Sequence, residues 1–332
     1  MSGAVIALRP ETGREAWDEE ATAYMTYLRV GRKSPLTLRA YGQNLEYFRR
    51  FLATTGRSQD PRDTTRRDVA AWMETLATAK PTTQRTRYVT VATYYKWLAS
   101  ADEEVITSSP FAGLKPPKVP DLDIPVIPTE DLARLLASVN GRSYADRRDR
   151  AIILLMASTG ARRSEIAGLL LEDVDNTSGT VLLTQTKGER PRMARYGDLA
   201  SEAMRHYLRA RRDHPRATKV YRLGAREDTA REGHPLFLGI AGHGRGGTLE
   251  DKGIAAMLKR RCKEAGVAHI NPHRFRHTWA DGVLAAGMSE GDVMRLGGWK
   301  NRDMLSRYGA SQAHARAMAH YLDPVDRMLK RR

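Results

Sequence analysis

The sequence predicts a mainly α-helical protein with two domains and one small β-sheet in the second domain. Apolar side chains recur at helical spacing through most of the 332 residues. Closely spaced prolines fill residues 109–127, which excludes a helix there and favours an extended connector. Strand-like patterns occur only beyond residue 179. We therefore expect a flexible leader, a helical domain, a linker and a larger second domain, over residues 1–14, 15–108, 109–127 and 128–332.

The first domain is expected to consist of four helices. The second of these has the clearest start signal, because Ser34 can cap a helix and Pro35 suits its first position. Gly56 ends this helix. The aromatic residues Tyr94 and Tyr95 of the last helix are expected in the core. The four helices are expected over residues 17–30, 35–55, 68–76 and 82–99.

The second domain is expected to open with a helix that Thr129 caps. An apolar helix over residues 151–157 stops at Gly160, and the next helix begins near Arg163 and continues through the leucines at 169–171. The strands of the sheet are expected at residues 180–185 and 192–196, as a hairpin turning through 186–190, and at 235–240. The polar segment 214–234 is expected to be a loop, and further helices are expected at 201–212, 249–265, 273–286, 290–296, 302–307 and 311–321.

Charge and composition point to a polyanionic partner. The net charge is +16 and the isoelectric point is about 10.1, with basic residues in excess in both parts of the chain. An Arg-rich surface without such a partner would give the same totals, but nucleic acid is the commonest partner of so basic a protein. The chain has no apolar run of about 18 residues, so no membrane span is expected. Cys262 is the only cysteine, which excludes an internal disulfide and predicts a cytoplasmic, nucleoid-associated protein.

One group of residues has the chemistry needed to bind and break a phosphodiester. Arg162 follows a helix-ending glycine and begins the next helix, and its planar fork matches two phosphate oxygens. Glu165, one turn further on, can hold that guanidinium in place. His273 and Arg276 are three residues apart, so on a helix they share a face. Each of these residues taken alone is more often a surface charge or a core side chain.

Two further residues complete the set. Tyr308 lies nine residues after Trp299, and a tyrosine can attack phosphorus if surrounding positive charge and a base activate it. Lys187 lies in the turn of the expected hairpin, where a lysine is ordinarily a surface residue but can also reach a leaving oxygen as an acid.

Together these motifs resemble the tyrosine recombinase, or phage integrase, family. The family pattern is an Arg after Thr-Gly-x, a hairpin Lys, His-x-x-Arg, Leu-Gly-His/Trp, and a Tyr nine residues later. The chain matches it in order with Thr159-Gly160-Ala161-Arg162, Lys187, His273-Arg274-Phe275-Arg276, Gly297-Gly298-Trp299 and Tyr308. The resemblance covers about residues 15–325. The chain departs from the commoner pattern in having Trp in place of His at 299 and a longer segment at 213–234.

The resemblance implies a role for each matched residue. Arg162, Arg276 and Trp299 would bind the scissile phosphate, with Trp299 donating its indole N–H. Tyr308 would form a 3′-phosphotyrosyl bond and release a 5′-hydroxyl. Lys187 would protonate the leaving oxygen, His273 would assist proton transfer, and Glu165 would support Arg162, all without metal or cofactor.

The resemblance also implies a fold and partners. It implies a SAM-like helical core-binding domain and an α-rich catalytic domain that form a C-shaped clamp on double-stranded DNA. The expected substrate is a pair of inverted-repeat core sites held by a homotetramer, because too few residues precede the first helix for an additional DNA-binding domain. Residues 311–329 would dock either on their own domain or on a neighbouring protomer. The residues expected to contact DNA are Arg39, Arg85, Arg87, Lys96, Arg163 and Arg274.

Other interpretations fit parts of the sequence. A helical DNA-binding protein without catalysis fits the charge but needs no tyrosine nucleophile, and a type IB topoisomerase shares the phosphotyrosyl step. His269, His273 and His277 are spaced by four residues, but Arg274 stands where a zinc helix of the protease type needs Glu, so no metal site is expected. Residues 242–247 match Gly-x-Gly-x-x-Gly, but no βαβ unit surrounds them, so no dinucleotide site is expected.

Overall fold

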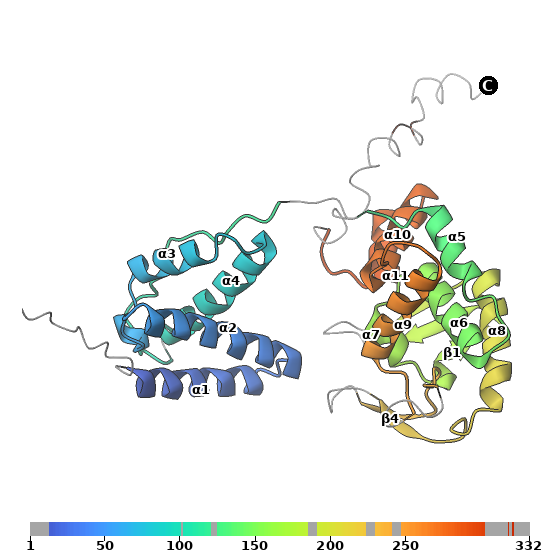
Figure 1. Ribbon diagram of the computed structural model, residues 1–332, viewed down its shortest axis with the longest axis horizontal. Helices are drawn as coiled ribbons and strands as arrows, with labels where there is room; N and C mark the ends of the chain where they lie inside the picture. Colours follow the sequence, from blue (N-terminus) through green and yellow to red (C-terminus); the bar gives the residue numbers. More distant parts are fainter. Residues whose placement is uncertain are drawn as a thin grey trace, which may run out of the picture. The chain divides into compact units, whose positions relative to one another are not determined.

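In the computed structural model the chain separates into two compact units, residues 1–121 and 122–332, and each is described by itself (Figure 1). The structure describes residues 13–100, 102–120, 125–184, 191–223, 230–240 and 247–302, together with 318 and 321. The division between the units falls inside the segment 109–127 that the sequence predicts as a linker. The expected leader lies outside the described residues, apart from Gly13 and Arg14, where the first helix begins.

The first unit consists of α-helices and one short 3-10 helix. Its α-helices are α1 (Arg14–Val30), α2 (Pro35–Thr54), α3 (Arg66–Thr75) and α4 (Pro81–Leu98). All four predicted helices are confirmed, with ends displaced by at most three residues. Ser34 caps α2 as predicted, accepting a hydrogen bond of 3.2 Å from the backbone N–H of Thr37. The 3-10 helix at Pro61–Asp63 was not predicted, and Asp60 caps it.

The core of the first unit is built largely from aromatic rings. Tyr94 and Tyr95 are fully buried, as predicted, and Trp72 meets Phe48 edge to face with ring centroids 4.8 Å apart. Trp17 packs on both Phe48 and Tyr94. Aromatic pairs at such distances add to the free energy gained from burying apolar area, so this small unit obtains a dense core from few side chains.

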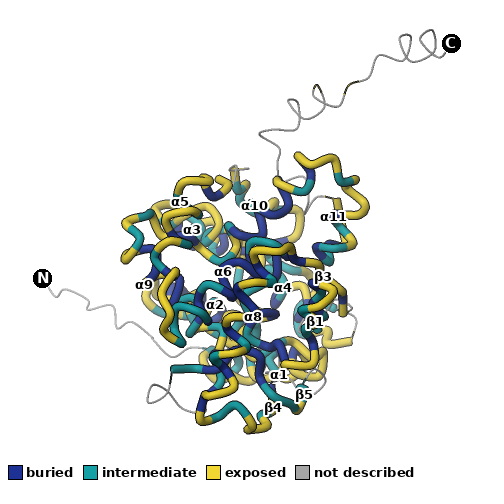
Figure 2. The backbone as a smooth tube through the Cα atoms, turned by 90° about the vertical axis from the view of Figure 1, so that its right-hand side faces the viewer, coloured by how far each residue is buried: buried dark blue, intermediate teal, exposed yellow. Residues whose placement is uncertain are grey.

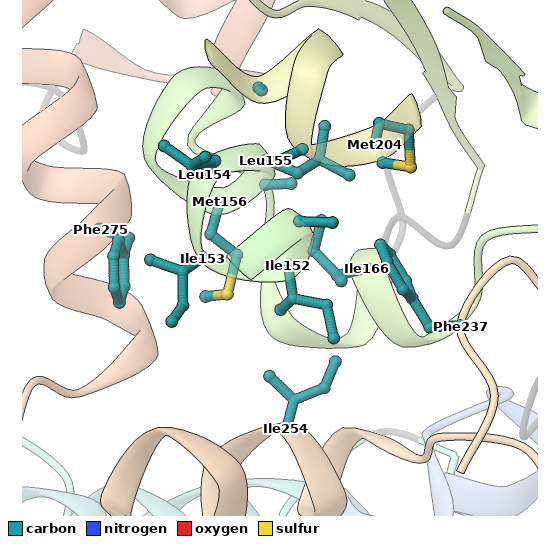
Figure 3. Close-up of a cluster of buried hydrophobic side chains, with 14 of the residues drawn as sticks. Ile152, Ile153, Leu154, Leu155, Met156, Ile166, Met204, Phe237, Ile254 and Phe275 are labelled. Carbon is teal, nitrogen blue, oxygen red and sulfur yellow. The ribbon is translucent and has the colours of Figure 1, made fainter. Parts of the chain in front are cut away.

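The second unit packs its helices around α6 (Tyr144–Thr159). The other helices are α5 (Thr129–Ala137), α7 (Arg163–Ala167), α8 (Asp198–Arg212), α9 (Asp251–Glu264), α10 (Pro272–Ala285) and α11 (Glu290–Gly297). Most of α6 is buried (Figure 2). Figure 3 shows Ile152 of α6 in the core that α7, α8, α9 and α10 line with Ile166, Met204, Ile254 and Phe275.

The sheet of the second unit contains the predicted hairpin. Its strands β1 (Val174–Asp175), β2 (Thr180–Leu183) and β3 (Arg192–Arg195) are antiparallel in the order β1-β2-β3. Leu183 pairs with Arg192 at the last described position before the turn. Residues 185–190, which include Lys187, lie outside the described residues. β1 was not predicted, because it is only two residues long.

The segment 214–234 is not simply a loop, and that prediction was wrong. It contains a second hairpin of β4 (Tyr221–Leu223) and β5 (Arg231–Gly233), which pairs Arg222 with Glu232. Only Leu223 among these strand residues is buried. β4 alternates over only three residues and β5 does not alternate, so neither strand carries the longer alternation by which strands are recognised.

The predicted strand at 235–240 was also wrong. Its backbone forms only two isolated bridges, from Pro235 to Leu170 and from Leu238 to Thr248. Residues 236 and 237 form a bend between the two bridges, so the pairing does not continue as a ladder. The partner segment explains a further error. α7 ends at Ala167, and the leucines at 169–171 leave the helix to hydrogen-bond with residues 234–236.

Several helix ends also differ from the predictions. Pro128, not Thr129, is the capping residue of α5. α6 begins at Tyr144, seven residues before the expected start, with Ser143 as its cap. The charged residues Arg148 and Asp149 lie in this first part and are buried, because they pair with each other at 2.7 Å. Such pairing makes buried charge tolerable but leaves no apolar pattern in the sequence.

The remaining predicted helices after residue 200 have two outcomes. Helices at 201–212, 249–265, 273–286 and 290–296 are confirmed by α8 to α11. Those expected at 302–307 and 311–321 fall on residues that the structure describes only at 302, 318 and 321. None of the helices in the described ranges combines the length and apolar character that a membrane crossing requires.

Candidate active site

The junction between α6 and α7 positions the first arginine of the predicted site. α6 ends at Gly160, whose φ of 58° is in the left-handed region. A Cβ atom at Gly160 would lie 2.4 Å from the Trp279 ring, so the chain can reverse here only with glycine. Arg162 follows in extended conformation as the residue that precedes α7. Its predicted place at a helix start is therefore confirmed.

Glu165 holds Arg162 through both backbone and side chain. One carboxylate oxygen accepts from the Arg162 backbone N–H at 2.7 Å, and the other accepts from Nη1 at 2.9 Å. Burial acts to raise the pKa of Glu165, but hydrogen bonding and charge from Arg192 and Arg162 outweigh it and lower the pKa. Glu165 is thus a buried carboxylate, whereas the Arg162 side chain remains 20% exposed.

Arg192 on β3 is a residue of this site that the sequence reasoning missed. Its Nη1 and Nη2 donate to the two oxygens of Glu165, each at 2.8 Å, and its Nε donates to the Leu296 carbonyl at 2.8 Å. Arg192 and Ala194 form the buried face of β3, while Met193 is exposed. A basic residue on the buried face of a strand needs a buried acidic partner, and this was the signal that could have found it.

Arg276 of α10 reaches the same place from the opposite side. It is 2% exposed. Its Nη1 donates to the Gly160 carbonyl at 2.9 Å, and its Nη2 donates to the Gly297 carbonyl at the end of α11. The guanidinium carbon lies 4.1 Å from the centre of the Trp299 ring, a cation–π contact. Trp299 is buried and packs against Trp279.

His273 begins the same helix one turn before Arg276. Asn271 caps this helix by accepting from the His273 backbone N–H at 3.0 Å. Desolvation lowers the pKa of His273, and the positive charges of Arg276, Arg162 and Arg163 lower it further. The imidazole is therefore neutral at neutral pH and can accept a proton.

These residues enclose a basic cleft of about 290 Å³. Three predicted site residues, Arg162, His273 and Arg276, line it together. Asp251 at the start of α9 also lines it and pairs with Arg163 at 2.9 Å. The other lining residues are Ala161, Ser164, Asn271 and Pro272. Guanidinium groups beside a neutral imidazole can bind a phosphodiester and accept a proton from a nucleophile.

The other predicted site residues have varied positions. The ring of Trp299 packs against the Arg276 guanidinium, and its indole nitrogen is buried. Lys187 and Tyr308 lie outside the described residues. His277 is buried, and burial with the neighbouring charge of His273 lowers its pKa to about 4.

The histidine and glycine patterns of the sequence have the following places in the structure. Among the residues with described positions, no group of three or more His, Cys, Asp or Glu side chains could hold a metal ion. The glycine-rich segment at 242–247 is described only at Gly247.

The residues predicted to contact DNA divide between the two units. Arg39, Arg85 and Lys96 are exposed on the first unit, and Arg85 donates to the Pro117 carbonyl at 3.1 Å. Arg87 lies 3.7 Å over the centre of the Tyr47 ring.

In the second unit both candidates have protein partners. Arg163 pairs with Asp251 at the cleft. Arg274 donates to the carbonyls of Pro125 and Val126 at 3.1 and 2.8 Å, which ties the end of the linker to α10.

Comparison with known families agrees with this geometry. The Phage integrase family matches residues 125–314, and the Phage integrase N-terminal SAM-like domain matches residues 21–102. Since the first match alone covers more than half of the 332 residues, the chain belongs to the phage integrase family. The resemblance seen in the motifs is thereby confirmed.

Relatives of known class extend the similarity to most of the chain. Tyrosine recombinase XerC from Corynebacterium efficiens is 30% identical over 313 residues, covering 86% of this chain and 88% of that protein. Tyrosine recombinase XerC from Chromobacterium violaceum is 29% identical over 296 residues, covering 88% and 90%. The enzyme class is therefore that of the site-specific tyrosine recombinases.

Solved structures share the fold at lower sequence identity. A lambda integrase dimer (residues 75–356 of that protein) bound to a COC′ core site has a TM-score of 0.66 and 15% identity, and the match covers 92% of this chain and 97% of that one. The Tn1549 transposon integrase in complex with transposon right end DNA has a TM-score of 0.67 and 17% identity, covering 94% and 99%. The predicted mainly α-helical class with a SAM-like first domain is confirmed.

Proposed function

We propose that this protein recombines DNA at specific sites by cleaving and rejoining strands through a 3′-phosphotyrosyl intermediate. One observation carries the proposal: Arg162, His273 and Arg276, from two distant segments, line one basic cleft. Preorganised guanidinium groups stabilise the charge that develops on the non-bridging oxygens of a phosphodiester under attack. The DNA bound in two of the structural relatives supports the choice of DNA as substrate.

The proposed reaction proceeds by in-line transfer of the phosphoryl group. The phenolic oxygen of Tyr308 attacks the scissile phosphorus, and the bond from phosphorus to the 5′ oxygen breaks. Neutral His273 receives the phenolic proton, and Lys187 gives a proton to the leaving 5′ oxygen. Arg162 and Arg276 bind the non-bridging oxygens. Because one phosphodiester replaces another, a partner strand's 5′-hydroxyl can reverse the step without a nucleotide cofactor.

Two residues support the arginines in this proposal. Glu165 holds Arg162, as its buried contacts indicate. The ring of Trp299 packs on the Arg276 guanidinium, so it can hold that group toward the cleft. Donation from the Trp299 indole N–H to phosphate stays a prediction, and it requires exposure of a nitrogen that is buried in this structure.

The proposed assembly is a homotetramer on two inverted-repeat core sites, with two rounds of strand exchange. Exchange between two duplexes requires four cleavages, one by each protomer. The two units would enclose the duplex as a C-shaped clamp. In the first unit a cleft of about 290 Å³ between α2 and α4, lined by Asn44, Thr82, Thr83, Thr86 and Arg87, offers polar groups to the DNA. Cys262 is free and buried, which is compatible with action on the nucleoid in a reducing cytoplasm.

A nicked suicide DNA that carries the protein's own site tests the proposal. Loss of the short 3′ fragment traps the covalent protein–DNA adduct, which migrates as a shifted band under denaturing conditions. The adduct is expected with the natural chain and not with Tyr308→Phe. If Tyr308→Phe forms the adduct, the assignment of the nucleophile is wrong.

Companion assays separate recombination from the alternatives. Relaxation of one supercoiled duplex without exchange between two sites would indicate topoisomerase-like action. Site binding without any adduct would indicate a DNA-binding protein without catalysis. Exchange between two sites is the expected result.

A further inference from the structure

Hydrogen bonds and two short backbone steps connect Arg162 and Arg276, the two arginines of the cleft. This path passes through Arg192. Arg162 and Arg192 share the Glu165 carboxylate. Arg192 continues to the Leu296 carbonyl at the end of α11. The adjacent Gly297 carbonyl accepts from Arg276, which also donates to the Gly160 carbonyl, two residues before Arg162. The path thus connects α7, β3, α11 and α10.

Arg192 does not take part as a ligand of DNA. It is 8% exposed. Its three side-chain nitrogens, Nε, Nη1 and Nη2, all donate to Glu165 or Leu296. A planar guanidinium that meets both oxygens of a carboxylate is held in one orientation. Arg192 therefore fixes the position of Glu165 rather than offering charge to the cleft.

Removing Arg192 would change the balance of charge around Glu165. The carboxylate is fully buried, and a buried charge that loses one partner draws more strongly on the partners that remain. The remaining cation is Arg162, whose side chain is 20% exposed at the cleft. With Arg192 in place, the Arg162 side chain donates to one Glu165 oxygen only, at 2.9 Å. Without Arg192, both oxygens are open to the Arg162 guanidinium, which turns further onto Glu165 and away from the phosphate.

We propose that Arg192 is a positioning residue that holds Glu165 so that Arg162 faces the scissile phosphate. This inference rests on the proposed function, because it assigns a task to Arg162 in phosphate binding. Arg192 acts through Arg162, so its loss should reproduce the defect of Arg162→Ala in kind. It should not add to that defect once Arg162 is absent.

The test compares an ordinary phosphate with a methylphosphonate at the cleavage site of the suicide DNA. A methyl group in place of one non-bridging oxygen removes the negative charge that an arginine would stabilise. On the phosphate, Arg162→Ala is expected to slow adduct formation by about 10²–10³-fold, and Arg192→Met by about 10-fold or more. One methylphosphonate stereoisomer should reduce the loss in Arg162→Ala, and the same isomer should reduce the loss in Arg192→Met.

The double variant gives a second readout. Arg162→Ala combined with Arg192→Met should be no slower than Arg162→Ala alone, because both changes disable one contact. Arg192→Lys keeps the charge but loses the bidentate geometry, so an intermediate rate is expected. It also provides a folded variant if Arg192→Met does not fold. The control is Arg195→Met, three residues along β3 and exposed on its other face, with a rate within about twofold of the natural chain.

Besides a natural rate in the Arg192 variants, two results would overturn the inference. One is an equal loss on phosphate and methylphosphonate in the Arg192 variants, and the other is a double variant whose loss is the product of the two single losses. Failure of the proposed function looks different, because then the natural chain itself forms no covalent adduct. If the natural chain forms the adduct and the Arg192 variants match its rate, only the role of Arg192 is wrong.

Discussion

The two units of this chain bury different kinds of side chain. Among the described residues, Glu20 is the one buried acidic or basic side chain of the first unit, whose core is aromatic and aliphatic. The second unit buries five arginines and four acidic residues, namely Arg148, Arg192, Arg211, Arg261 and Arg276 with Asp149, Glu165, Asp173 and Asp281. Its apolar core is also larger. Folding of the second unit therefore removes many charged groups from water, which costs free energy, whereas folding of the first unit removes one.

This difference fits the tasks proposed for the two units. The first unit keeps basic side chains such as Arg39 and Lys96 exposed, where they can meet DNA phosphates without fixed geometry. The second unit must hold Arg162 and Arg276 in fixed positions, and buried ionic partners provide that order. Four experiments test this contrast.

The largest effect is expected at the ionic centre of the second unit. Asp149 is fully buried and pairs with Arg148, Arg260 and Arg261 at 2.7 to 3.1 Å. Asp149→Ala leaves the buried Arg148 without its carboxylate and removes one of the three carboxylates around Arg261, so the free energy of unfolding should fall by about 3–5 kcal/mol. Backbone amide hydrogen exchange can be followed separately in peptides from each unit. The lower stability should appear as faster exchange in the second unit alone.

The matched control is Asp131→Ala, in a pair with the largely exposed Arg134. Such a surface pair contributes less than about 1 kcal/mol. Equal losses from the two substitutions would contradict the claim that buried pairs stabilise the second unit.

The corresponding change in the first unit removes an aromatic ring. Trp72 is fully buried, and its indole nitrogen has no hydrogen-bond partner within the described structure. Trp72→Leu therefore removes packing and no hydrogen bond, and the free energy of unfolding should fall by roughly 2–3 kcal/mol. Urea denaturation with exchange readout in residues 14–98 measures it. If exchange speeds up as much in the second unit, the two cores are not energetically separate.

A change in pH should affect the two units in different ranges. All nine histidines follow residue 205, and burial lowers the pKa of His277 to about 4. The unfolded chain takes up a proton on this histidine below a pH of about 6.5, whereas the folded chain does so only near pH 4. Stability is therefore full above pH 6.5 and is lost as the pH falls toward 4. Between pH 7 and 5 the second unit should lose about 2 kcal/mol.

The first unit should respond only in a more acidic range. In the first unit the hydrogen bonds of Arg49 lower the pKa of Glu46 to about 2. The stability that ionised Glu46 contributes is therefore lost only below a pH of about 4.5. Thermal unfolding at each pH checks the contrast, and His277→Gln should flatten the slope of the second unit. An equal loss in both units between pH 7 and 5 would sink this explanation.

How far the sequence predicts the molecule depends on whether a signal is local. Helices with apolar stripes and caps, such as the one that Ser34 begins, were predicted within a few residues. Gly160 and the His273–Arg276 spacing located the described part of the site, because glycine at positive φ and a shared helix face are local properties. The predicted donation from Trp299 to phosphate stays a prediction, and the structure adds that its ring lies over the Arg276 guanidinium.

The features that the sequence did not predict depend on distant partners. The alternation of β3 hints that Arg192 faces inward, but its partner Glu165 lies 27 residues earlier and no local pattern identifies it. The start of α6 is similar, because the burial of Asp149 depends on Arg261, 112 residues later. The leucines at 169–171 suit either a helix or a strand, and Pro235 decides between them.

The smallest effect on stability is expected at the exposed face of the first unit. The same change should also affect DNA binding. Arg87 lies over the Tyr47 ring beside the cleft between α2 and α4. Arg87→Ala removes one partly exposed cation–π contact, so the free energy of unfolding should fall by less than about 1 kcal/mol. If Arg87 also contacts a DNA phosphate, the plot of log affinity against log salt concentration should lose about one unit of slope.

Fluorescence anisotropy with a labelled duplex at several salt concentrations measures that slope. The control is Arg50→Ala on α2, whose exposed side chain pairs with Glu46 and lines no cleft described here, and its slope should equal that of the natural chain. An unchanged slope in Arg87→Ala would place this arginine outside the DNA contact. The first unit would then bind DNA through other exposed cations, while its contrast with the buried ionic order of the second unit would remain.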